Sequence, residues 1–93
     1  MRVRWTRRAE RSLAAIADFI ALDNPQAAHE TISRIRRAAE SLLLSPKLGR
    51  PGRVEGTREL VVTPNYILPY RIKGGEVQIL HVFHARRRWP GSF

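Results

Sequence analysis

The chain has 93 residues, no cysteine and a formal net charge of +9 at neutral pH. This length favours one domain, residues 1–93, with a modest core, and the lack of cysteine excludes disulfide bonds and thiol chemistry. No apolar run approaches the length of a membrane span, so we expect a cytoplasmic protein without membrane association. The positive charge favours an acidic partner, either nucleic acid or an acidic protein.

The first stretch with a clear pattern is a short strand that leads into a helix. Arg2–Trp5 alternates charged and apolar residues, which is typical of a strand. Thr6 suits the N-cap of a helix because its hydroxyl can accept a hydrogen bond from a free backbone N–H. The helix is predicted over Arg7–Ala21, where apolar residues recur every three or four positions. This apolar stripe consists of Ala9, Leu13, Ile16 and Ile20.

A second helix is predicted over Pro25–Leu44. Asn24 suits its N-cap and Pro25 its first position, while Ser45-Pro46 stops it. The loop between the two helices is so short that they must be antiparallel neighbours. We expect both apolar stripes to pack on one face of a sheet, the second stripe being Ala28, Ile32, Ile35, Ala39 and Leu42.

Residues 47–56 form a basic loop that is rich in glycine and proline. Glycine lets a backbone approach a phosphate closely, but the pattern matches neither a Walker nor a dinucleotide-binding motif, so no nucleotide site is predicted. An ordinary connection with solvated charges is the simpler interpretation of each residue here. Together with the later arginines, however, Lys47, Arg50 and Arg53 could line one basic surface.

Three strand-like runs follow this loop and predict an antiparallel meander. They cover Thr57–Val62, Tyr66–Lys73 and Glu76–His84, and Gly74-Gly75 is typical of a two-residue hairpin. Pro69 cannot donate to a strand ladder, so it predicts an unpaired edge position or a bulge. The predicted fold class is α+β, with an N-terminal strand and an antiparallel helical hairpin packed on a C-terminal three-stranded antiparallel meander.

The three histidines do not have the spacing of a metal site. His81 and His84 lie three apart on a predicted strand, hence on opposite faces, so we expect neither a metal nor another cofactor. His81 is expected in the core and His29 in solvent. For His84, at the strand end beside the arginines, packing and a functional role are both open interpretations. Tyr66 and Tyr70 share the apolar face of their strand and are expected in the core.

The order of these motifs resembles the RelE/ParE family of type II toxins, over almost the whole chain. The segments that carry the resemblance are GRPGRV from Gly49, GTRELVV from Gly56, Tyr70-Arg71 and the ending from His84 to Pro90. The resemblance implies a small toxin with a helical hairpin on an antiparallel sheet, and a neutralising antitoxin from the same operon. Because the chain carries +9, we expect the toxin-binding segment of that antitoxin to be acidic and partly apolar, and to dock across the helical hairpin and the sheet.

The resemblance leaves two targets open, and they need different residues. A RelE-like toxin is a ribosome-dependent mRNA endoribonuclease, which needs a base, an acid and a cation for the phosphate charge. For that activity the resemblance implies Arg58, His84 and Arg86. Ile67 stands where such toxins have an arginine directly after Tyr66, and no late tyrosine occurs, so this catalytic set is incomplete.

These departures favour a ParE-like toxin, which poisons DNA gyrase by binding to it. Such a toxin needs a surface for its target, and the clustering of the arginines indicates one. An arginine-rich proteome and solvated charges are the simpler alternatives, and Trp89 has the further alternative of core packing. The predicted target-binding residues are Arg50, Arg53, Arg58, Arg86, Arg87, Arg88 and Trp89.

Overall fold

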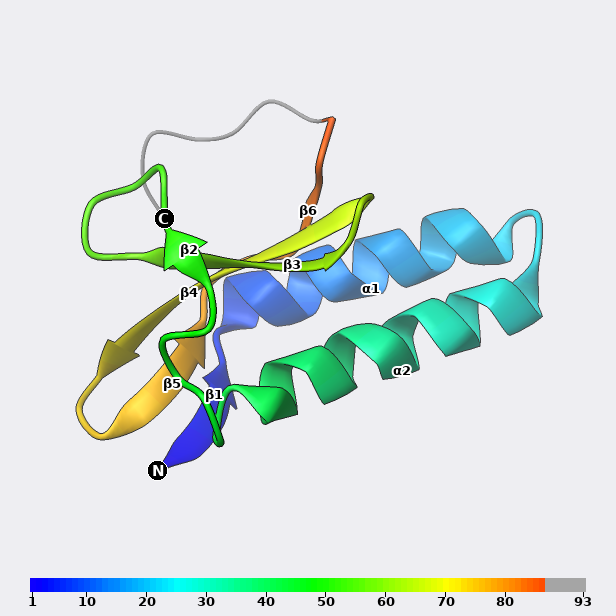
Figure 1. The fold of residues 1–93 in the computed structure, drawn as a ribbon. Helices are drawn as coiled ribbons and strands as arrows, with labels where there is room; N and C mark the ends of the chain where they lie inside the picture. The colour runs from blue at the N-terminus through cyan, green and yellow to red at the C-terminus, as the bar shows by residue number, and fades with distance from the viewer. Residues whose placement is uncertain (87–93) are drawn as a thin grey trace.

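Two helices and six short strands make up residues 1–86, the part of the chain that this computed structural model describes (Figure 1). The elements are β1 (Arg2–Trp5), α1 (Arg7–Ala21), α2 (Pro25–Ser41), β2 (Arg50–Pro51), β3 (Arg58–Thr63), β4 (Tyr66–Lys73), β5 (Glu76–Ile79) and β6 (Phe83–His84). The sheet has the order β1-β5-β4-β3-β2, and β6 pairs with the first residues of β4. The antiparallel helical hairpin lies beside this sheet, which confirms the predicted α+β class.

Both helices begin at the capping residues that the sequence indicates. The hydroxyl oxygen of Thr6 accepts a hydrogen bond from the N–H of Ala9 at 3.1 Å. The side-chain oxygen of Asn24 accepts one from the N–H of Ala27 at 3.0 Å. Each bond satisfies a backbone donor that the first turn of a helix leaves free, which fixes where the helix starts.

The chain tightens after α2, which ends earlier than predicted. The backbone N–H groups of Leu42, Leu43 and Leu44 donate to carbonyls three residues earlier, at 3.1, 3.1 and 3.2 Å. The predicted end at Leu44 is therefore corrected to Ser41. Pro46 gives the physical reason, since the residue before a proline avoids the α conformation and the chain leaves the helix through a tighter turn.

The core lies between the helical hairpin and one face of the sheet. Leu13, Ile35 and Leu68, which come from both helices and β4, are all 2% exposed or less. Ile20, Ile32 and Tyr66 contact this cluster but are only partly buried, while Tyr70 is fully buried. The two predicted apolar stripes therefore pack as expected. The remaining members of the cluster are Ala9, Ile16, Ala39, Leu42, Leu60, Val77, Ile79 and Val82.

β1 pairs in parallel with β5, a contact that was not predicted from the sequence. Trp5 lies beside Ile79, and the backbone N–H of Thr6 donates to the carbonyl of Ile79 at 3.1 Å. The guanidinium of Arg36 on α2 lies 4.9 Å from the ring centre of Trp5, a cation–π distance. The start of α1 is thereby tied to the sheet, and the sheet as a whole is mixed.

The predicted third strand, Glu76–His84, is interrupted between β5 and β6. Where the two pieces pair with β4, residues 80–82 face only Leu68 and Pro69, so one extra residue bulges out. The carbonyl of Pro69 accepts the N–H of Leu80 at 2.9 Å on this side, but its nitrogen has no hydrogen to return a bond. Of the two arrangements predicted for Pro69, the structure shows the bulge.

Two smaller differences concern the loop before β3. β3 begins at Arg58 and ends at Thr63, one residue later at each end than predicted. β2 was not predicted, because two residues are too few to show a period. It pairs with Glu59 and Arg58 of β3, so the Gly/Pro loop folds back along the edge of the sheet.

Candidate target-binding surface

A buried carboxylate holds the basic loop against the sheet. Glu59 is 2% exposed, and its Oε1 accepts a hydrogen bond from Nη2 of Arg50 at 3.1 Å. Its Oε2 accepts the backbone N–H of Arg53 at 2.8 Å and lies 3.7 Å from Nε of the same residue. The two arginine side chains remain 52% and 51% exposed. Their charges are therefore fixed in position and partly neutralised by one carboxylate.

The side chain of Arg58 holds the same loop by bonding to backbone carbonyls of the loop. Its Nη1 donates to the carbonyl of Gly49 at 2.8 Å and to that of Lys47 at 3.3 Å. The hydroxyl of Tyr70 donates to the carbonyl of Pro46 at 2.7 Å and accepts the N–H of Gly49 at 2.9 Å. Burial raises the pKa of Tyr70, while the Gly49 bond and the charge of Arg58 oppose this rise. Arg58 and Tyr70 together hold the segment from Pro46 to Gly49 in place.

Close packing explains the two glycines of the loop motif. A Cβ atom on Gly49 would lie 2.6 Å from Cε1 of Tyr70 and 2.9 Å from the carbonyl oxygen of Glu59. A Cβ atom on Gly52 would overlap the hydroxyl of Thr57, whose carbonyl accepts the N–H of Gly52 at 2.8 Å. The glycines are thus required by the way in which this loop packs on β3 and β4.

The other predicted residues follow β6, near the first residues of β4. The ring of His84 meets that of Tyr66 edge-on, with 5.5 Å between the ring centres, and its Nδ1 accepts the N–H of Arg86 at 3.3 Å. The N–H of Ala85 donates to the carbonyl of Asn65 at 2.8 Å, which holds the turn after β6. The Arg86 side chain is exposed. The predictions for Arg87, Arg88 and Trp89 lie outside the described residues.

The register of the sheet separates these two groups. Arg58 lies opposite Tyr70 on one side of β4, and His84 lies opposite Tyr66 on the other side. Four residues along a strand cover about 13 Å at the usual rise per residue. The structure therefore brings Arg50 and Arg53 together on Glu59, with Arg58 bonded to the same loop, and it brings His84 together with Arg86, but it keeps the two groups apart. The sequence predicted a single basic surface, but within the described residues these arginines lie in two separate regions.

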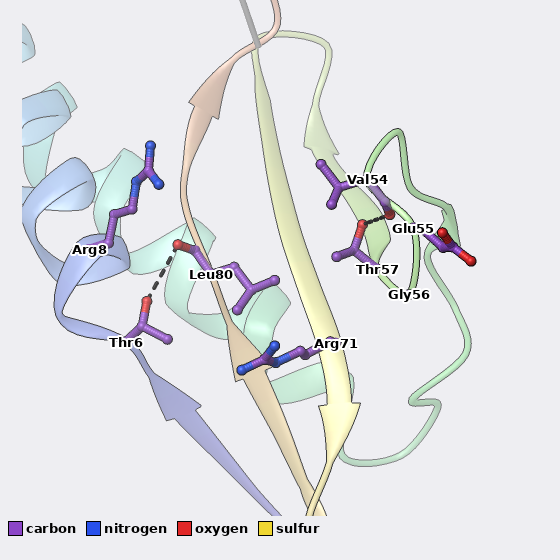
Figure 2. A pocket seen from close by; sticks show the side chains of 8 residues that line it. All are labelled: Thr6, Arg8, Val54, Glu55, Gly56, Thr57, Arg71 and Leu80. Carbon is purple, nitrogen blue, oxygen red and sulfur yellow. Dashed lines mark hydrogen bonds between the residues drawn. The ribbon is translucent and has the colours of Figure 1, made fainter. Parts of the chain in front are cut away.

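A groove that the sequence analysis did not single out lies between the start of α1 and the loop before β3 (Figure 2). Its volume is about 440 Å³, and Arg8 of α1, Arg71 of β4 and Glu55 of the loop line it together with Thr6, Thr57 and Leu80. Nε of Arg71 donates to Oε1 of Gln78 at 2.6 Å. The alternation along β4 predicted which face of the sheet Arg71 lies on. The groove itself could not be predicted, because the position of α1 beside Arg71 depends on the β1–β5 pairing, and that pairing has no signature in the local sequence.

Charged side chains of β1 and β5 continue from Arg71 across the sheet. Glu76 accepts hydrogen bonds from Nε of Arg4 at 2.7 Å and from Nε of Arg2 at 3.1 Å. Nε2 of Gln78 also donates to Glu76, at 2.8 Å. The bond from Arg4, followed by that from Gln78, lowers the pKa of Glu76 to about 2. The network therefore favours the ionised carboxylate and joins the edge strand β1 to its neighbour.

His81 is half-buried in the interruption between β5 and β6, so the prediction that placed it across a strand from His84 is wrong. Its Nδ1 lies 3.0 Å from the carbonyl oxygen of Val82, and its ring stacks on Phe83 with 4.0 Å between the centres. Burial lowers the pKa of His81, which favours the neutral ring. His29 is exposed on α2, as expected.

The described part of the chain contains no group of three His, Asp or Glu side chains that could hold a metal ion. Neither of the two helices in residues 1–86 has the length and apolar character needed to cross a membrane.

Known toxins and their relatives match the chain over nearly its full length. The family model for the ParE toxin of the type II toxin–antitoxin system parDE matches residues 3–89. The protein Y4kP of Sinorhizobium fredii is 48% identical over 90 residues, which cover 96% of this chain and 93% of that protein. Toxin RelE2 of Caulobacter vibrioides is 41% identical over 83 residues, which cover 89% of this chain and 93% of that protein.

Two solved structures share the fold. A chain of the chromosomal ParDE toxin–antitoxin system from P. aeruginosa is 33% identical with a TM-score of 0.80, covering 90% of this chain and 95% of that chain. A chain of the toxin–antitoxin complex RelBE2 from Mycobacterium tuberculosis is 30% identical with a TM-score of 0.64, covering 88% and 94%. The chain therefore belongs to the ParE toxin family of type II toxin–antitoxin systems.

Proposed function

We propose that this toxin arrests growth by binding DNA gyrase and that it does not cut mRNA. The observation that carries the proposal is the separation of Arg58 from His84 along β4. Cleavage of an RNA phosphodiester needs a base, an acid and a phosphate-binding cation within hydrogen-bond reach of one reacting group. Side chains anchored about 13 Å apart along a strand do not meet that requirement.

The same candidate side chains are also engaged in holding the fold. Arg58 donates to two loop carbonyls, and Nδ1 of His84 accepts a backbone N–H. Ile67, which replaces the second-strand arginine implied for RNA-cleaving toxins, is 4% exposed. Binding, in contrast, needs an ordered surface, and arginine is among the residue types that most often dominate interface energies. Arg86 offers such a charge two residues after the end of β6.

We further propose that an antitoxin expressed with the toxin neutralises it in the cytoplasm. The two similar structures come from ParDE and RelBE2, which are toxin–antitoxin systems. A toxin of charge +9 favours an acidic segment, whose carboxylates pair with arginines as the segment folds on binding.

The test measures both activities with the same purified toxin. We expect inhibition of DNA supercoiling by gyrase, and intact mRNA on programmed ribosomes. Arg86→Glu should weaken gyrase inhibition about tenfold or more, because a charge reversal at an interfacial arginine removes more than about 1.4 kcal/mol. Its melting temperature should stay unchanged because the side chain is exposed. Arg37→Glu, at an exposed arginine of α2, is the matched control and should inhibit like the wild type.

The opposite outcome is equally specific. Codon-dependent cleavage of mRNA on the ribosome, abolished by Arg58→Ala or by His84→Ala, would overturn the gyrase proposal and assign this chain to the ribosome-dependent endoribonucleases.

A further inference from the structure

Two apolar grooves open on the surface of the described chain, at opposite ends of the helical hairpin. The base groove lies beyond the end of α2, has a volume of about 570 Å³ and is lined by Met1, Ser45, Pro46, Lys47, Leu48 and Ile72. The tip groove lies near the turn between the helices, where α1 approaches Tyr66 and His84, and has a volume of about 250 Å³. The two grooves differ in the charges around them.

The base groove continues the apolar face of the sheet past the end of the helices. Leu68, Tyr70 and Ile72 share one face of β4, and the first two are fully buried in the core. Ile72, which lies beyond α2, is 38% exposed, while Met1 and Leu48 beside it are 65% and 59% exposed. Exposed apolar side chains gathered in one patch are typical of interaction surfaces.

The surroundings of the base groove are cationic. Lys47 lines the groove, and Lys73 follows Ile72 on β4. The guanidinium of Arg58 lies close by, because it bonds to the carbonyl of Lys47 at 3.3 Å. Glu76 of β5 is already paired with two arginines of β1. A partner that buries apolar side chains here is therefore favoured if it also brings negative charge.

The helical side of the tip groove has the opposite sign. Residues 12–33 contain Asp18, Asp23 and Glu30 but no lysine or arginine, although the whole chain has 17 basic residues. Phe19 and Leu22 are 68% and 83% exposed there. The tip is thus apolar as well, but an acidic segment would meet like charge on its helical side, although Arg86 lies beside His84 on the other side.

We propose that the base groove receives the apolar side chains of the acidic segment by which the antitoxin binds this toxin, and that the tip groove is outside that contact. This inference rests on the neutralisation proposed above and adds the place of binding. Apolar side chains spaced by about one helical turn would enter the groove beside Leu48 and Ile72, while flanking carboxylates reach Lys47 and Arg58.

The test compares two serine substitutions of exposed leucines. The antitoxin is the product of the reading frame that adjoins the toxin gene, and its affinity is measured by calorimetry against each toxin variant. Leu48→Ser should weaken binding about tenfold or more, whereas Leu22→Ser should stay within about twofold of the wild type. Both side chains are largely exposed, so both variants should melt like the wild type.

A charge variant and a growth assay separate this inference from the proposal on which it rests. Lys47→Glu should weaken binding and reduce its salt dependence. In cells, Leu48→Ser should still arrest growth but should no longer be rescued by the antitoxin. If the antitoxin rescues Leu48→Ser as well as the wild type, the assignment of binding to the base groove is wrong, while the proposal that the antitoxin neutralises the toxin stands. If the antitoxin does not bind the wild type, both proposals fail.

Two further outcomes would also overturn the inference. Loss of binding in Leu22→Ser but not in Leu48→Ser would move the contact to the tip. Self-association of the toxin without antitoxin, removed by Leu48→Ser, would make the base groove a contact between two copies of this chain.

Discussion

Arg58 illustrates, at the scale of single residues, how a side chain typical of a binding site can serve the fold itself. Its guanidinium bonds to two loop carbonyls, and Glu59 beside it holds Arg50 and Arg53. The sequence predicted that Arg50, Arg53 and Arg58 lie near one another, because they are close along the chain. The sequence could not show that one buried carboxylate holds Arg50 and Arg53, since a Glu in a strand is usually exposed to solvent.

The role of Glu59 predicts a specific loss of stability. Glu59→Gln keeps the shape of the side chain but removes the charge that Arg50 and the backbone N–H of Arg53 share. We expect the free energy of unfolding to fall by about 1–3 kcal/mol, the cost of weakening charge-assisted bonds to a buried group. Urea denaturation measures it. Glu55→Gln changes an exposed carboxylate of the same loop and should cost less than about 0.5 kcal/mol. Equal losses in the two variants would show that Glu59 is not the clamp.

At the scale of elements, the parts of the fold that the sequence predicts are those with a local cause. The two helices follow from apolar spacing and from the caps Thr6 and Asn24, and the β4–β5 hairpin follows from Gly74-Gly75. The parallel β1–β5 pairing has no local signature, since parallel strands meet only through a long connection. The separation of Arg58 from Arg86 was missed for a related reason: it depends on which residues of β4 each strand faces.

β1 is held at the sheet edge by ionised groups, so its attachment should depend on pH. Arg4, Gln78 and Arg2 lower the pKa of Glu76 from 4.5 to about 2 in the folded chain. The stabilisation is therefore complete above the unfolded pKa of 4.5 and is lost as the pH falls toward 2. In that window Glu76→Gln should lose less stability per pH unit than the wild type in urea denaturation. Glu40→Gln, on the exposed side of α2, should keep the wild-type slope; equal slopes in all three proteins would contradict the assignment.

At the scale of the whole molecule, one core joins the hairpin to the sheet, and the charges of the hairpin are distributed unevenly along it. Ile35 of α2 is fully buried in that core, together with Leu68 and Val77 of the sheet. Residues 12–33, which contain three carboxylates and no lysine or arginine, form the far end of the hairpin. The basic loop and the base groove lie at the other end, near β1 and β3. The net charge of +9 therefore understates how basic the sheet end is.

Truncation of Ile35 tests whether the hairpin and the sheet share this core. Ile35→Ala should lower the free energy of unfolding by about 2–5 kcal/mol, because it removes buried methyl groups and leaves a cavity. Chemical denaturation of the purified toxin gives the value. Arg34→Ala, at the exposed position just before it, should stay within about 0.5 kcal/mol of the wild type. A loss below about 1 kcal/mol for Ile35→Ala would mean that this stripe does not carry the packing.

The pairing of β1 with β5 also sets the order in which the fold can be completed. Arg2 and Glu76 are bonded across 74 positions of the chain, so the first strand to be synthesised waits for one of the last. Such distant contacts raise the contact order and slow folding relative to helical proteins of similar size. Met1 and Ile72, which line the base groove together, come from equally distant parts of the chain. A nascent chain therefore acquires both its sheet edge and its base groove only after the late strands have left the ribosome.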